Sequence, residues 1–164
     1  MPQPALQIIS PNAQSTRQLG QQLGQLLLPG DVVCLVGGLG AGKTTFAAGI
    51  GQGWGSTSRL TSPTYTLVHE HRRPADSQTL YHMDAYRLET ADALESVGFG
   101  DIWAGNGPIL IEWPERLGDM LPSERLWIEI EAESELDESQ RTLRFWAQGH
   151  RFEHLLADFE AVGK

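Results

Sequence analysis

One segment of the chain has the residue types and the spacing of a phosphate-binding loop. It runs Gly37-Gly38-Leu39-Gly40-Ala41-Gly42-Lys43-Thr44, which fits the pattern G-x-x-x-x-G-K-S/T. Glycines allow the backbone to curl so that successive N–H groups form a nest for phosphate oxygens. Lys43 supplies a mobile positive charge for the β- and γ-phosphates, and the Thr44 hydroxyl is a hard oxygen ligand suited to Mg²⁺. The segment therefore predicts a nucleoside triphosphate site; a glycine-rich turn with a solvated lysine is the alternative.

A carboxylate at the end of another strand could complete such a site. Ile109 to Ile111 is an apolar run that ends on Glu112, and ligands of open α/β sheets lie beyond the carboxyl ends of the strands. A carboxylate in that place can bind Mg²⁺ directly or through water. The alternative is a solvated glutamate at a strand end.

The segment from His82 to Arg87 offers a second acidic group. His82 and Asp84 have the same parity on a predicted strand and can share one face. Asp84 could orient water or hold Mg²⁺ in the outer shell, and Arg87 could neutralise phosphate charge. In the alternative interpretation Asp84 pairs with Arg87, His82 packs beside them, and the cluster is structural.

Hydroxyl groups gather in a third segment, Thr61-Ser62-Pro63-Thr64. A loop of this composition could respond to the γ-phosphate as switch loops do. An ordinary turn would need the same residue types.

The elements that must position these groups follow from periodicity and from turn residues. Strands are predicted at Val32–Val36, Tyr65–His71, Thr79–Asp84, Ile109–Ile111, Leu126–Glu133 and Thr142–Ala147. Helices are predicted after Ser10-Pro11-Asn12, from Lys43 to about Gly51, from Thr90 to Val97 and from Arg151 to Val162. Alternating strands and helices in the first half indicate an α/β fold of P-loop NTPase type. Its mostly parallel central sheet would be flanked by helices, with antiparallel strands added in the C-terminal half.

Composition limits the class of protein. A chain of 164 residues has the size of one domain, so we expect a single domain over residues 1–164. No apolar run approaches the ~20 residues that span a bilayer, the first ten residues do not resemble a signal peptide, and Cys34 is the only cysteine. We therefore expect a cytoplasmic protein without membrane contact. The net charge of −9 disfavours direct binding of nucleic acid, which depends largely on Lys and Arg.

The lysine count bears on which nucleotide is bound. Guanine recognition of the Ras type uses an Asn/Thr-Lys-x-Asp motif, and the only lysines here are Lys43 and the terminal Lys164. ATP is therefore favoured over GTP. Two other functions stay open. A small-molecule kinase would need an arginine-rich lid, for which only Arg72 and Arg73 are adjacent candidates, and a nucleotide-sensing scaffold would need no turnover.

Taken together, four segments resemble the successive signatures of the bacterial TsaE (YjeE) family. They are Gly37 to Phe46, Thr61 to Tyr65, His82 to Leu88 and Ile111-Glu112-Trp113-Pro114-Glu115-Arg116. The resemblance runs from about Ser10 to Gly149. It implies a P-loop ATPase domain that hydrolyses ATP slowly with Mg²⁺ and acts with the proteins TsaB and TsaD. Those partners would transfer threonylcarbamoyl to adenosine 37 of tRNAs that read codons beginning with A, so this chain would reach tRNA only indirectly.

The resemblance also assigns roles to residues. Lys43 would hold phosphate, Thr44 and Glu112 would hold magnesium, Asp84 would support hydrolysis, and residues 61–64 would form a switch-like loop. The implied nucleotide-binding set comprises Gly37, Gly38, Leu39, Gly40, Ala41, Gly42, Lys43, Thr44, Thr45, Asn12, Trp113 and Arg141. Two positions depart from the family pattern: Gly38 stands where an aspartate is usual, and Gln140 precedes Arg141 where a glycine is common.

Overall fold

A seven-stranded mixed sheet forms the centre of the protein, with the strand order β1-β7-β6-β2-β5-β4-β3. The computed structural model describes residues 2–61, 63, 67–87, 98–134 and 137–163. The strands are β1 (Leu6–Ser10), β2 (Val32–Val36), β3 (Val68–Arg72), β4 (Thr79–Asp84), β5 (Ile109–Glu112), β6 (Arg125–Ser134) and β7 (Asp137–Gln148). The α-helices are α1 (Ala13–Gly24), α2 (Lys43–Trp54), α4 (Phe99–Trp103) and α5 (His150–Val162).

The inner strands are parallel and the outer strands antiparallel. Strand β2 pairs in parallel with both β5 and β6, and β4 pairs in parallel with β5. The pairs β3–β4, β6–β7 and β1–β7 are antiparallel. The predicted α/β class is therefore confirmed, including the antiparallel additions of the C-terminal half. Because parallel strands share one carboxyl edge, the ends of β2, β4 and β5 lie close together.

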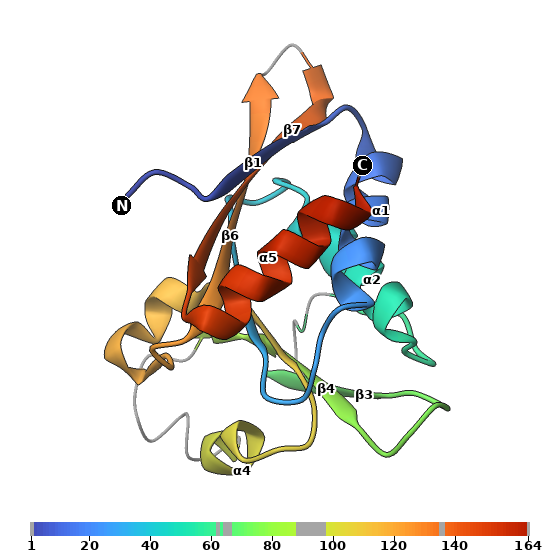
Figure 1. Ribbon diagram of the computed structural model, residues 1–164, viewed down its shortest axis with the longest axis vertical. Helices are drawn as coiled ribbons and strands as arrows, with labels where there is room; N and C mark the ends of the chain where they lie inside the picture. Colours follow the sequence, from blue (N-terminus) through green and yellow to red (C-terminus); the bar gives the residue numbers. More distant parts are fainter. Residues whose placement is uncertain (1, 62, 64–66, 88–97, 135–136, 164) are drawn as a thin grey trace.

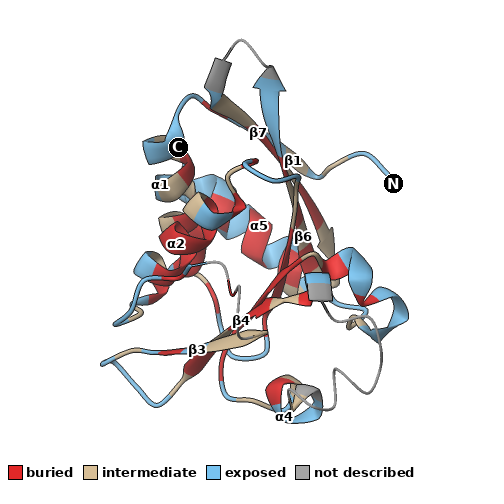
Figure 2. Ribbon diagram, turned by 180° about the vertical axis from the view of Figure 1, so that it is seen from behind, coloured by how far each residue is buried: buried red, intermediate tan, exposed pale blue. Residues whose placement is uncertain are grey.

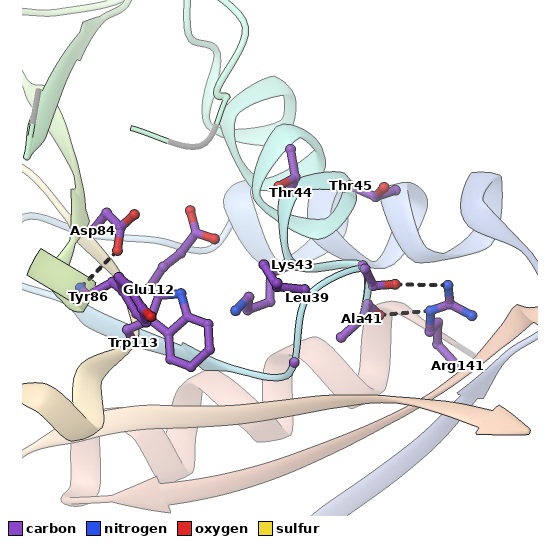
Figure 3. A pocket seen from close by; sticks show the side chains of 13 residues that line it. Leu39, Ala41, Lys43, Thr44, Thr45, Asp84, Tyr86, Glu112, Trp113 and Arg141 are labelled. Atoms are coloured by element: carbon purple, nitrogen blue, oxygen red, sulfur yellow. Dashed lines mark hydrogen bonds between the residues drawn. The ribbon is translucent and has the colours of Figure 1, made fainter. Parts of the chain in front are cut away.

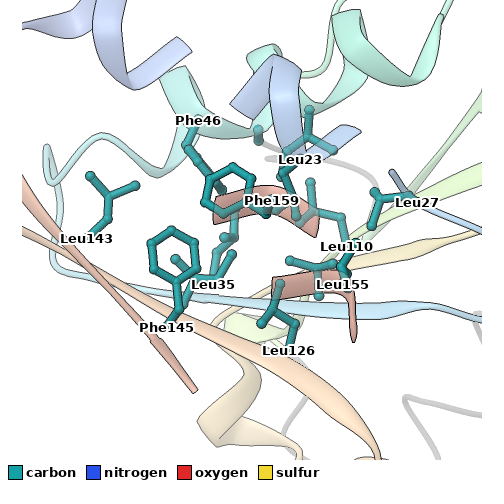
Figure 4. Packing of buried hydrophobic residues seen from close by; sticks show 14 of the residues in the cluster. Leu23, Leu27, Leu35, Phe46, Leu110, Leu126, Leu143, Phe145, Leu155 and Phe159 are labelled. Atoms are coloured by element: carbon teal, nitrogen blue, oxygen red, sulfur yellow. The ribbon is translucent and has the colours of Figure 1, made fainter. Parts of the chain in front are cut away.

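Hydrophobic packing fixes both faces of the sheet. Helices α1, α2 and α5 cover one face (Figure 1), where Leu23, Phe46 and Phe159 enter the larger core cluster with residues of the central strands (Figure 4). A smaller cluster on the other face includes Cys34 and Ile102 of α4. In Figure 2 the buried colour follows α2, whereas α5 alternates between buried and exposed residues, as expected of an amphipathic helix on the surface.

Helices α1 and α2 pack with their backbones in direct contact. A Cβ atom built on Gly20 would lie 2.3 Å from the carbonyl oxygen of Phe46, and one on Gly24 would lie 2.1 Å from that of Ile50. Cβ atoms essentially never come so close to backbone, so these glycines allow an approach that no other residue permits. The contact holds in place the helix that begins with Lys43.

Most predicted elements agree with the structure. Strands β2 and β4 have the predicted bounds, α1 follows Asn12, whose side chain caps it, and α2 extends three residues beyond Gly51. Strand β3 begins at Val68, and residues 64–66 lie outside the described part, as does the helix predicted for Thr90–Val97. Strand β1 and the short helix α4 were not predicted from the sequence. No helix among the described ranges is long and apolar enough to cross a membrane.

Candidate nucleotide site

A cavity of about 500 Å³ opens at the carboxyl ends of β2, β4 and β5, where open α/β sheets bind ligands. Its volume suits a small-molecule ligand. It is lined by Gly38, Leu39, Gly40, Ala41, Gly42, Lys43, Thr44, Thr45, Asp84, Tyr86, Glu112, Trp113 and Arg141. Figure 3 shows the phosphate loop with Arg141 on one side, and the two acidic residues with Trp113 on the other.

The loop from β2 to α2 has the backbone geometry of a nest. Gly40 and Gly42 adopt positive φ angles of 74° and 107°, a conformation that residues with a Cβ rarely adopt. Gly37 has a different reason to be glycine, because a Cβ there would lie 2.5 Å from the carbonyl oxygen of Ile130. Helix α2 begins directly after the loop, so its first amides point toward the cavity and favour an anion.

Lys43 is a largely buried cation at the centre of this arrangement. Its side chain donates a hydrogen bond to the Gly37 carbonyl, and its Nζ lies 3.9 Å from the centroid of the Trp113 ring. Burial lowers the pKa of Lys43, while the negative charges of Glu112, Glu115 and Asp84 oppose that shift. The ammonium is therefore partly desolvated, which strengthens its attraction for a phosphate.

Arg141, on β7, contacts the loop itself. Its Nε donates to the Ala41 carbonyl at 2.8 Å and its Nη2 donates to the Gly40 carbonyl at 3.2 Å (Figure 3). These bonds hold two carbonyl groups, so the guanidinium supports the loop conformation. Arg141 also lines the cavity, and its predicted approach to the nucleotide remains a prediction.

Two carboxylates come from adjacent strands. Asp84 and Glu112 are direct partners in the parallel pairing of β4 with β5, so their side chains share a face of the sheet. Asp84 Oδ1 accepts a hydrogen bond from the Tyr86 amide at 2.9 Å. Glu112 is only 3% exposed, and its Oε2 lies 2.6 Å from Nε2 of His82. His82 shares that face, as its parity with Asp84 predicts.

Trp113 forms a wall of the cavity in a strained conformation. It has φ 58° and ψ 46°, and no other non-glycine residue in the described ranges has a positive φ. Such strain in a bulky residue is uncommon and clusters at functional sites. The Tyr86 ring meets Trp113 edge-on at 5.1 Å, and the Arg116 guanidinium lies over Tyr86 at 4.8 Å.

Several predicted residues lie elsewhere or outside the described part. Gly37 and Asn12 are not among the residues that line the cavity; the Asn12 side chain accepts from the Ser15 amide and caps α1. In the switch-like loop, Thr61 is exposed and Pro63 is buried, and Ser62 and Thr64 lie outside the described residues. Arg87 belongs to a 3-10 helix after β4, but its side chain is not described.

Two residues contribute to the site in ways that were not predicted from the sequence. Tyr86 lines the cavity, and His82 contacts Glu112 rather than only packing beside Asp84. The shared parity of His82 and Asp84 was a signal for this contact, but the neighbour of their strand could not be identified without the sheet order.

The oxygen atoms that line the cavity suit an Mg²⁺ ion that takes only a few ligands from the protein. No group of three or more His, Cys, Asp or Glu able to hold a metal occurs among the described residues. Mg²⁺ in nucleotide sites usually keeps several waters and takes one or two protein oxygens plus phosphate oxygens. The Thr44 hydroxyl and the Glu112 carboxylate, which both line the cavity, have that chemistry.

Comparisons with known proteins agree on one family. The family model described as threonylcarbamoyl adenosine biosynthesis protein TsaE matches residues 10–143. The chain is 38% identical over 144 residues to the tRNA threonylcarbamoyladenosine biosynthesis protein TsaE of Bacillus subtilis, which covers 88% of this chain and 87% of that protein. It is 41% identical over 124 residues to the protein of the same name from Synechocystis, covering 73% and 76%. The crystal structure of Bacillus subtilis YdiB superimposes with a TM-score of 0.80 at 32% identity, covering 97% of this chain and 96% of that one.

Proposed function

We propose, because this chain belongs to the TsaE family, that it binds ATP with Mg²⁺ and hydrolyses it to ADP and phosphate. The family acts in the biosynthesis of tRNA threonylcarbamoyladenosine, and its members are proteins of the P-loop ATPase type. The observation that carries the proposal is the pairing of a phosphate loop with two carboxylates across one cavity.

In this proposal, different groups of the chain bind the phosphates, hold the metal and orient the attacking water. Backbone amides of the loop and the Lys43 ammonium bind the β- and γ-phosphates. The Thr44 hydroxyl and the Glu112 carboxylate would hold Mg²⁺, which when bound would neutralise charge on those phosphates. Asp84, at the same strand edge as Glu112, orients the water that attacks the γ-phosphorus. As the water oxygen bonds to the γ-phosphorus, the bond to the bridging oxygen breaks and ADP leaves; one proton of the water stays on the phosphate product and the other passes to solvent.

The proposal that this chain acts with partner proteins rests on its net charge and on its family. A net charge of −9 is unfavourable for holding tRNA, because counterion release requires Lys and Arg at the phosphates. We propose a single cytoplasmic P-loop domain, spanning residues 1–164, that docks on TsaB and TsaD and contacts tRNA only through them. Isolated turnover is then slow, because docking completes the site.

Single-turnover hydrolysis, with and without the TsaB–TsaD pair, tests the proposal. Lys43→Ala should abolish nucleotide binding in calorimetry, whereas Glu112→Ala should still bind ATP but not hydrolyse it. Glu160→Ala, on the exposed side of α5, is the matched control and should behave as the wild type. Normal hydrolysis by Glu112→Ala in the presence of the partners would contradict the assignment. Release of free phosphate, rather than transfer to an added acceptor, separates an ATPase from a kinase.

A further inference from the structure

A buried hydrogen bond joins the candidate site to the strand beside it. His82 of β4 and Glu112 of β5 are 0% and 3% exposed, and His82 Nε2 lies 2.6 Å from Glu112 Oε2. An ionised carboxylate removed from water is costly unless a hydrogen-bond donor satisfies it. His82 supplies that donor.

The surroundings of the imidazole favour a proton on one of its nitrogens. An ionised carboxylate only accepts hydrogen bonds, so the nitrogen that faces it, Nε2, is the donor beside an ionised Glu112. The other nitrogen, Nδ1, is buried and has no hydrogen-bond partner among the described residues. A proton on Nδ1 would therefore be an unsatisfied buried donor, which is rarer in proteins than an unsatisfied acceptor. The Nε2–H tautomer satisfies both conditions.

This bond makes the two carboxylate oxygens unequal as ligands. Oε2 already accepts from His82, so Oε1 is the better oxygen for a cation in the cavity, which Glu112 lines. The Lys43 ammonium also attracts Glu112. Without His82, the carboxylate could rotate toward Lys43, and both groups would then be withdrawn from the phosphates.

We propose that His82 is a positioning residue that fixes the Glu112 carboxylate so that Oε1 faces the Mg²⁺ of a bound nucleotide. The inference rests on the proposed function and goes beyond it, because it assigns the site a supporting group that touches neither nucleotide nor metal. Such outer partners orient ligands, and their removal typically costs about 10–100-fold in metal affinity.

Two substitutions separate positioning from packing. His82→Gln keeps an N–H donor, since the amide nitrogen of glutamine is as many bonds from Cβ as Nε2 of histidine. His82→Leu fills much of the space without a donor. His69→Leu is the matched control, because His69 lies beside His82 with ring centroids 6.5 Å apart and is not a hydrogen-bond partner of Glu112.

The probe is Mn²⁺, whose binding to the ADP complex is measured by electron paramagnetic resonance. We expect Mn²⁺ affinity to fall about 10–100-fold in His82→Leu and to stay within a few-fold of the wild type in His82→Gln and His69→Leu. ADP affinity in EDTA should be the same in all of them. If His82→Leu bound Mn²⁺ as tightly as the wild type, the inference would be overturned while the proposed function would stand. Failure of the wild type to bind ADP and Mn²⁺ would overturn the proposed function as well.

A second measurement does not depend on the stability of a variant. Nitrogen-15 NMR of the wild-type protein identifies the tautomer of each histidine. We expect the His82 proton on Nε2, and a proton found on Nδ1 alone would overturn the inference, because Nε2 could then not donate to Glu112.

Discussion

Replacing Gly20 with alanine tests whether backbone contact between α1 and α2 holds the phosphate-loop helix in place. The added Cβ would lie 2.3 Å from the Phe46 carbonyl oxygen, 2.9 Å from the Ile50 nitrogen and 3.0 Å from the Gly49 Cα. All three are backbone atoms, which cannot rotate away as a side chain can. Helix α1 must therefore move by about 1 Å to restore an ordinary contact.

The expected cost combines two opposing effects. Alanine improves helix propensity over glycine by about 1 kcal/mol. Overpacking costs typically about 1–3 kcal/mol and occasionally more, and at Gly20 the clash involves backbone only, so the upper part of that range applies. We expect a net loss of about 2 kcal/mol in the free energy of unfolding. For a chain of this length that corresponds to about 6 °C in Tm.

Thermal unfolding by circular dichroism measures this effect. Gly100→Ala is the matched control, because Gly100 lies within α4 and a Cβ there meets nothing within 4 Å; its Tm should be unchanged or slightly higher. ATP affinity should also weaken in Gly20→Ala, since α2 begins with Lys43. A Tm within 1 °C of the wild type, with ATP affinity unchanged, would refute the reasoning.

Three further predictions concern the site and its surroundings. Arg141→Met removes two hydrogen bonds to phosphate-loop carbonyls and should weaken ATP binding about tenfold in calorimetry. Arg144→Met is the control. Equal losses of ATP affinity in the two variants would contradict a specific role of Arg141 in supporting the loop. Burial, with two neighbouring histidines, lowers the pKa of His71 from 6.5 to about 4. The unfolded state binds more protons between these values, so the free energy of unfolding should fall as pH drops from 6.5 toward 4, by at most about 3 kcal/mol. Urea titrations at several pH values should show that the free energy of unfolding of His71→Gln depends less on pH than that of the wild type. An unchanged pH dependence would exclude His71 as its origin. Finally, bound nucleotide should draw Lys43 away from the Trp113 ring, whose centroid lies 3.9 Å from Lys43 Nζ, and so change the tryptophan fluorescence. Trp113→Phe should abolish this change. A fluorescence change that persists in Trp113→Phe would have to come from another tryptophan.

Local sequence was sufficient for the phosphate loop and for the inner strands. The loop needs only consecutive residues: glycines that reach positive φ, then lysine and threonine at the start of a helix. Strand β2 could be bounded because its apolar run lies between Asp31 and Gly37, whereas β4 mixes polar and apolar residues and ends on Asp84. Glu112 was identified as a candidate because it directly follows such a run.

Strand β1 shows the limit of that reasoning. It is five residues long, lies at an edge of the sheet and, among the described strands, pairs with β7 alone. Burial alternates along β1, but the exposed residue Ile9 is apolar, so the sequence of this short run does not alternate clearly. The capping role of Asn12 was visible in the sequence, whereas the strand before it depended on a partner more than 130 residues away.

What the sequence determined by itself was which groups are available for chemistry: a nest for phosphates, one ammonium, one hydroxyl and two candidate carboxylates. The tertiary structure decided how they are held. It brought Arg141 into contact with a loop 100 residues earlier in the chain. It also set Asp84 beside Glu112 and His82 within hydrogen-bond distance of the Glu112 carboxylate. These contacts depend on the order and register of strands, which arise from packing between distant segments and leave no periodic signal in either segment alone.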